Sequence, residues 1–88
     1  MTVTIEPVSR IRPGQRARVV RMEVREELRR RLRDMGLIEG TLVECLHKAP
    51  LGDPAAYQIR GAVIALRKSD SAGILTIPAE NTEKGRIQ

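Results

Sequence analysis

Residues 41–66, TLVECLHKAPLGDPAAYQIRGAVIAL, decide the fold. Two short apolar runs, LVECL and AVIAL, lie on either side of a loop, Pro50–Pro54, that holds two prolines, a glycine and an aspartate. A helix cannot pass through this loop, because each proline fixes φ and removes a backbone donor. Gly61 supplies a second tight reversal, between the runs YQI and VIAL. The stretch therefore predicts a three-stranded meander.

Upstream of the meander the sequence predicts a further strand. Pro13-Gly14 is a turn pair, and Arg16–Val24 is typical of a strand. Its inward face stays undecided, because Val19 and Val20 are adjacent and both apolar. The run VTIEPV before it could add an edge strand.

A helix is predicted over residues 23–35, where the spacing of apolar residues changes. Four of them form one helical stripe at i, i+4, i+8 and i+11: Val24, Leu28, Leu32 and Met35. Acidic residues precede basic ones by four positions in the pairs Glu26–Arg30 and Glu27–Arg31, the favourable order on a helix. Gly36 fits the left-handed residue of a Schellman cap, with Leu37 returning to contact Leu32.

After the meander we expect one helical turn capped by Ser69, then a strand over Ile74–Ile77 that Pro78 ends. The polar tail Ala79–Gln88 is predicted to be mobile. About five short strands with one inserted helix give a mainly β fold, and a small five-stranded SH3-like barrel covers such strands best. We expect a single domain over residues 1–78.

The composition of the chain excludes several classes of protein. The chain has 88 residues, a net charge of +5, one cysteine and one aromatic residue, Tyr57. No apolar run is long enough to cross a bilayer, and the N-terminus lacks the pattern of a secretory signal, so we expect a cytoplasmic protein. The sequence holds no phosphate-binding glycine loop and no catalytic triad pattern, which predicts a non-enzymatic protein without a cofactor.

A series of short motifs runs in order along the chain: Arg31-Leu32, Met35-Gly36-Leu37, Gly40, Val43, Pro50–Pro54, Arg60-Gly61 and Leu66-Arg67. These motifs and their order resemble the FeoA family of bacterial ferrous iron transport. The resemblance implies an SH3-like domain that works with FeoB, a membrane permease with a cytosolic GTPase domain. It also implies an accessory role, peripheral to the membrane only through the partner, for a monomer or weak homodimer.

The candidate site residues fall into two sets. Those predicted to contact the partner are Arg31, Leu51, Gly52, Asp53, Arg60 and Arg67. Those predicted to be structural are Leu32, Met35, Gly36, Leu37, Gly40, Pro50, Pro54, Gly61 and Leu66. For the loop Ala49–Pro54 a conformational role is an equal alternative, in which the turn needs these residues for its own geometry and the Asp53 carboxylate bonds backbone amides.

Two other functions stay open. The arginine-rich helix (Arg25, Arg29, Arg30, Arg31 and Arg33) could bind nucleic acid or an acidic protein surface, although a solvated helix face is the simpler interpretation. Nucleic-acid partners are not expected, because a chain with one aromatic residue offers no platform for stacking bases. Cys45 and His47 should point to one face of a strand and could join Glu44 or Asp53 in a metal-sensing site, but they fall short of a structural zinc set, so we predict no metal ligands.

Overall fold

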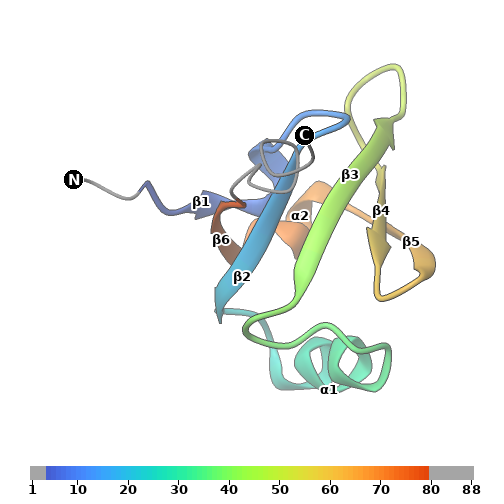
Figure 1. Cartoon of the computed structure of the whole chain (residues 1–88). Coiled ribbons are helices and arrows are strands. Elements are labelled where there is room, and N and C mark those ends of the chain that lie inside the picture. Colours follow the sequence, from blue (N-terminus) through green and yellow to red (C-terminus); the bar gives the residue numbers. More distant parts are fainter. Residues whose placement is uncertain (1–3, 80–88) are drawn as a thin grey trace.

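The computed structural model describes residues 4–79, and these form a six-stranded antiparallel sheet that curls on itself (Figure 1). The strand order is β1-β6-β2-β3-β4-β5. The elements along the chain are β1 (Glu6–Pro7), the 3₁₀ turn η1 (Val8–Arg10), β2 (Arg16–Met22), α1 (Glu26–Asp34), β3 (Leu42–Lys48), β4 (Ala55–Ile59), β5 (Ala62–Leu66), α2 (Lys68–Ser71) and β6 (Ile74–Pro78). The mainly β fold with one inserted helix is confirmed. The sixth strand, β1, is the edge strand that VTIEPV allowed.

The predicted meander is present as β3, β4 and β5. A two-residue turn joins β4 to β5, with φ of 49° at Arg60 and 85° at Gly61. Positive φ at both positions is typical of the type I′ turn, whose twist matches that of a hairpin. Between Cys45 and His47 the β3–β4 register shifts by one residue. This bulge breaks the alternation of side chains along β3.

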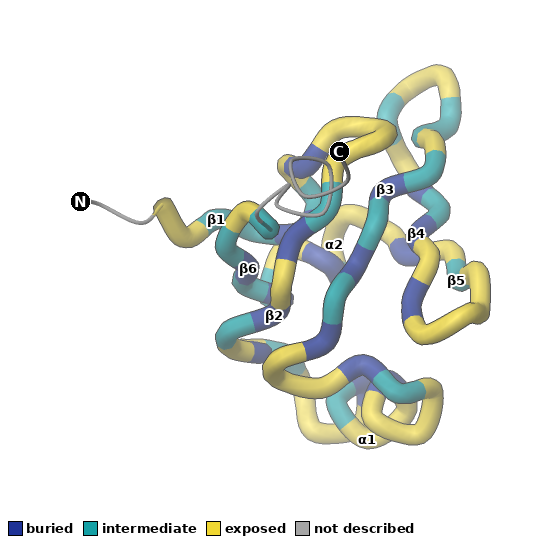
Figure 2. Tube along the Cα trace, viewed as in Figure 1, coloured by how far each residue is buried: buried dark blue, intermediate teal, exposed yellow. Residues whose placement is uncertain are grey.

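The buried apolar residues form one core cluster. Buried positions alternate with more exposed ones along β2, β3 and β4 (Figure 2), so one face of each strand contributes to the core. Strand β2 pairs with β3 on one side and β6 on the other, so it joins the two halves of the barrel. The sequence left open which of the two adjacent valines of β2 faces the core. The β2–β6 register shifts between Val19 and Arg21. Val19 is buried, whereas Val20 is half-buried.

Tyr57 fills the centre of the core. Its side chain is 1% exposed, and its hydroxyl donates a hydrogen bond of 3.4 Å to the carbonyl oxygen of Val8. Burial raises the pKa of this hydroxyl. A tyrosine in this position cannot stack on a nucleic-acid base, so its location argues against binding of single strands.

Helix α1 covers one end of the barrel and is shorter than predicted. It begins at Glu26 rather than Glu23, because Glu23 donates its backbone N–H to Gly73 in the β6 region and Arg25 is extended. Leu28 and Leu32 are buried as expected. The predicted strand likewise ends at Met22, two residues earlier than expected.

The end of α1 carries the expected cap. Leu37 donates its N–H to Leu32 over 2.8 Å and Gly36 donates to Arg33 over 2.9 Å, the two bonds of a Schellman motif. Met35 was expected to complete the apolar stripe, but its side chain is 39% exposed because the helix ends at Asp34 and Met35 has φ of −89° and ψ of 0°.

Helix α1 has an i,i+3 ion pair in place of the two predicted i,i+4 pairs. Arg29 approaches Glu26, three positions away, at 3.9 Å, and its guanidinium also donates to the carbonyl of Met22 at 2.9 Å. In the described part of the chain, neither predicted i,i+4 pair is within ion-pair distance. Ala79 donates its backbone N–H to Arg16, and the rest of the predicted tail, residues 80–88, lies outside the described residues.

Candidate partner-binding surface

The β3–β4 loop holds Leu51 in solvent. This side chain is 95% exposed, the highest exposure among the large apolar residues that the structure describes. The loop closes on its own backbone, because Gly52 donates to Ala49 at 2.7 Å and Ala49 donates to Pro54 at 3.0 Å. A loop braced in this way presents Leu51 at a fixed place, where its burial by a partner would remove apolar surface from water.

Asp53 connects this loop to α2. Its Oδ1 accepts a hydrogen bond of 2.7 Å from the backbone N–H of Lys68, the first residue of α2. Ser69 was expected to cap this helix, but α2 begins at Lys68 and its flanking residue, Arg67, makes no side-chain cap. The cap instead comes from 15 residues upstream. Asp53 therefore bonds a backbone amide, as its conformational alternative expected, while its contact with a partner stays a prediction. The bond brings the loop next to the exposed Arg67.

Arg60 and Gly36 bring two distant motifs together. A Cβ at Gly36 would lie 2.6 Å from Cδ of Arg60 and 3.2 Å from its Nε, so the arginine packs on the bare glycine. Gly36 also has φ of 95°, which disfavours any other residue. The Met35-Gly36-Leu37 and Arg60-Gly61 motifs thus depend on one contact. Arg60 has at least a structural role.

A shallow hollow of about 280 Å³ lies beside α1. Side chains of both charges line it together with one leucine: Arg25, Glu27, Leu28, Arg30, Arg31 and Asp34. Arg31 is exposed, and within the described residues its side chain makes no hydrogen bond or ion pair. A mixed-charge surface of this kind is better suited to a protein partner than to a uniformly negative phosphate backbone.

The predicted contact residues do not form one site. The β3–β4 loop with Leu51 and the helix with Arg31 lie at opposite ends of the barrel (Figure 1). Leu51, Gly52, Asp53 and Arg67 belong to the loop end, whereas Arg60 packs on the segment that follows α1. A partner that contacts both sets must therefore span the long axis of the sheet.

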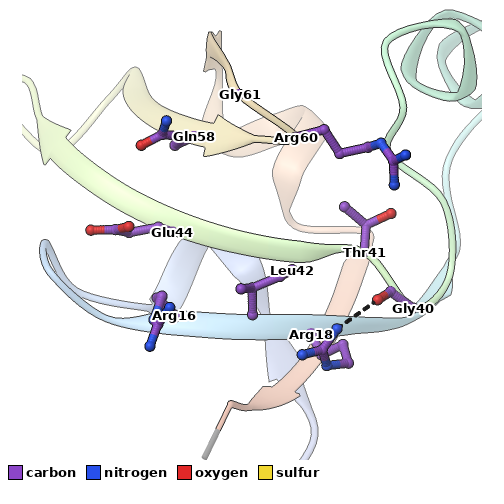
Figure 3. Close-up of a pocket in the computed structure, with 9 residues that line it drawn as sticks. All are labelled: Arg16, Arg18, Gly40, Thr41, Leu42, Glu44, Gln58, Arg60 and Gly61. Carbon is purple, nitrogen blue, oxygen red and sulfur yellow. Dashed lines mark hydrogen bonds between the residues drawn. The ribbon is translucent and has the colours of Figure 1, made fainter. Parts of the chain in front are cut away.

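A larger hollow of about 430 Å³, which was not predicted from the sequence, lies on the outer face of β2, β3 and β4. Figure 3 shows Arg16, Glu44 and Gln58 there on three neighbouring strands, where the register pairs Arg16 with Glu44 and Glu44 with Gln58. Arg18 donates to the carbonyl of Gly40 at 3.0 Å. The alternation Arg16-Ala17-Arg18 was the available signal, since it places both arginines on the face opposite the core.

The proposed metal residues are separated. Cys45 and His47 pair with the adjacent residues Tyr57 and Ala56, whose side chains alternate, so the bulge turns them to opposite faces. The prediction that they share a face is wrong. Cys45 is fully buried, and desolvation raises the pKa of its thiol. Across residues 4–79 no group of three histidine, cysteine, aspartate or glutamate side chains is placed to hold a metal ion.

Comparison with known proteins decides the family. The sequence profile of the FeoA domain matches residues 6–77. The chain belongs to the FeoA family. The FeoA-like protein of Clostridium acetobutylicum has the same fold, with 31% identity, a TM-score of 0.78, and coverage of 92% of this chain and 93% of that one. FeoA of Stenotrophomonas maltophilia, solved with zinc and described as a prokaryotic SH3 domain protein, is 26% identical with a TM-score of 0.71, over 80% of this chain and 87% of that one. The predicted SH3-like fold is therefore confirmed.

A curated relative joins this domain to a permease. The Fe(2+) transport protein A/Fe(2+) transporter FeoB fusion protein of Porphyromonas gingivalis is 36% identical over 67 residues, which is 76% of this FeoA chain. The chain spans 8% of the length of that relative. Among residues 4–79 of the FeoA chain itself, no helix has both the length and the apolar character needed to cross a membrane.

Proposed function

We propose that this FeoA chain is a cytosolic accessory protein of ferrous iron uptake, which binds the cytosolic part of a FeoB-type permease and modulates transport. The observation that carries the proposal is the fusion relative, in which a domain 36% identical to this chain belongs to the same polypeptide as the transporter. A domain fused to a partner in one organism is held at a high effective concentration there, which is an advantage when the two domains act together. For this chain the proposed association is binding between the FeoA domain and the cytosolic part of the permease.

The role that fits this surface is binding rather than catalysis. The one buried thiol, Cys45, is withdrawn from solvent, and burial raises its pKa, which opposes nucleophilic use. The exposed groups are instead the apolar side chain of Leu51 at one end of the barrel and the charged side chains of α1 at the other. Such surfaces fit a protein interface with an apolar anchor and a polar rim. The proposed contacts are Leu51 and Arg67 at the loop end and Arg31 at the helix end.

The binding test compares variants whose folds should be intact. The full chain is titrated against the purified cytosolic region of FeoB from the same genome, and the dissociation constant is measured. Leu51→Ser should weaken binding by about tenfold, since removing a buried apolar anchor costs on the order of 1–2 kcal/mol. The matched control is Ile5→Ser, which changes another exposed apolar residue, 58% exposed, away from the loop.

Charge reversal tests the helix end in the same assay. Arg31→Glu should weaken binding and reduce its dependence on salt, whereas Arg12→Glu, an exposed arginine outside both surfaces, should change it little. Asp53 is unsuitable for this purpose because its substitution also removes the cap of α2. Absence of saturable binding to every cytosolic segment of the permease would refute the proposal.

A further inference from the structure

Strand β5 forms an open edge of the sheet. It is hydrogen-bonded to β4 and to no other described strand, and it lies at the outside of the barrel (Figure 1). The sheet also ends at β1, but β1 has two residues, one of which is Pro7. Edges are commonly protected by short strands and by proline in this way. The β5 edge has five residues, all of them apolar: Ala62, Val63, Ile64, Ala65 and Leu66.

The register shows which backbone groups of β5 point outward. In the two-residue hairpin, Ile59 and Ala62 form the closing hydrogen-bonded pair, and hydrogen-bonded pairs then alternate along the strands without a shift. Ile64 and Leu66 therefore bond to β4, whereas the N–H and C=O groups of Val63 and Ala65 point away from it. In the described part of the chain, no hydrogen bond beyond the strand ladder involves either residue.

The exposed surface of β5 is that of a strand which can accept another strand. Val63 is 62% exposed and Ala65 is exposed, while Ile64 packs against the core. The strand contains no charge, no proline and no bulge, the features that usually prevent pairing at an edge. An extended segment laid on this edge would bond to the main chain of Val63 and Ala65 and cover the Val63 side chain.

The charges at the two ends of β5 distinguish a second copy of this chain from an acidic segment as the strand that would pair with this edge. Arg60 precedes β5 and Arg67 and Lys68 follow it, while at the second end the Asp53 carboxylate accepts a hydrogen bond from the backbone N–H of Lys68. An antiparallel second copy that paired all five residues would place its own Lys68 opposite Arg60. That juxtaposition of like charges is unfavourable. A segment with acidic residues around an apolar core would instead complement both ends.

We propose that the β5 edge binds an extended segment of a protein partner, with alternating apolar residues and acidic flanks, by strand addition at Val63 and Ala65. The inference does not rest on the permease as the partner. Strand addition can fail while the permease binds through Leu51 and Arg31, and the reverse result is equally open to measurement.

The test uses a synthetic peptide of about nine residues, which spans a five-residue strand and both flanks. Its core alternates valine and threonine, and two glutamates stand at each end. The peptide is titrated into the isotope-labelled full chain while amide shifts and solvent exchange are followed by NMR. At a peptide concentration about ten times the dissociation constant, exchange of the Val63 and Ala65 amides should slow by about tenfold, because it then requires dissociation.

Two control peptides test the charge and the hydrogen bonds without any change to the protein. A peptide with lysines in place of the glutamates should bind several-fold more weakly, with the difference shrinking as salt increases. A peptide methylated at the backbone nitrogens that face β5 should not bind, since it cannot donate to the edge. On the protein side, Val63→Pro removes an outward N–H without breaking the β4 ladder and should abolish binding, whereas Val63→Thr should retain it.

Four results would overturn the proposal. They are no saturable change with the acidic peptide, equal binding of the lysine peptide, undiminished binding of the methylated peptide, and protection of Val63 and Ala65 by dimerisation of the chain alone. Sedimentation of the peptide-free chain over a range of concentrations distinguishes the last of these from peptide binding.

Discussion

Replacing Asp53 by alanine should destabilise the barrel, because this carboxylate caps a helix that begins 15 residues further along the chain. The bond from the Lys68 N–H to Oδ1 is 2.7 Å long and exposed to solvent. Loss of a helix cap costs about 0.5–2 kcal/mol, and solvent exposure favours the lower half of that range, about 0.5–1 kcal/mol. For a domain of this size, each kcal/mol lowers the melting temperature by about 4–8 °C. The expected decrease is therefore about 2–8 °C.

Thermal unfolding followed by circular dichroism, together with urea titration, measures this loss. Asp53→Asn should retain most of the stability, because an asparagine oxygen accepts the same bond. Ser69→Ala is the matched control, since Ser69 lies in the same helix and makes no cap. Equal losses in Asp53→Ala and Ser69→Ala, or an unchanged melting temperature in Asp53→Ala, would show that the Asp53 carboxylate does not stabilise α2.

Further substitutions test the anchoring of α1, the contact between Gly36 and Arg60, and the buried thiol. Leu32→Ala truncates a fully buried side chain on the inner face of α1 and should lower the free energy of unfolding in urea by about 2–5 kcal/mol. A decrease below about 1 kcal/mol would show that Leu32 does not anchor the helix. Gly36→Ala should destabilise the folded chain for two reasons, the positive φ of Gly36 and a clash of the new Cβ with Arg60. In a double-mutant cycle, Arg60→Ala should remove only the loss of stability that comes from the clash, so strictly additive losses in the two single variants would contradict the packing of Arg60 on Gly36. For Cys45, burial raises the thiol pKa in the folded state, so its contribution to stability is constant below the ordinary pKa and is lost as pH rises above about 9. Cys45→Ala should flatten that decline, and an unchanged slope between the two proteins would count against a buried thiol.

The sequence predicted the elements whose signals are local. The proline-glycine loop, the Arg60-Gly61 turn and the Gly36 cap each follow from the conformations that their own residues allow, and each is present. The Leu28 and Leu32 stripe likewise identified the buried face of α1, because period and burial depend on neighbours a few positions away.

What the sequence could not predict depends on pairing between distant segments. The start of α1 is set by the bond from Glu23 to Gly73, and the cap of α2 comes from another loop. The bulge in β3 separates Cys45 from His47, although plain alternation would have placed them together. The outer hollow depends on the register of three strands, which no short window of sequence contains.

The proposed role of this FeoA chain is to present a binding surface to the permease. The most direct measurement is NMR shift mapping of the full labelled chain during titration with the soluble domain of FeoB from the same genome. Saturable shifts are expected at the β3–β4 loop around Leu51 and at the exposed face of α1 around Arg31, with the core amides near Tyr57 little changed. A spectrum that stays the same through a large excess of the permease domain would contradict the proposed role.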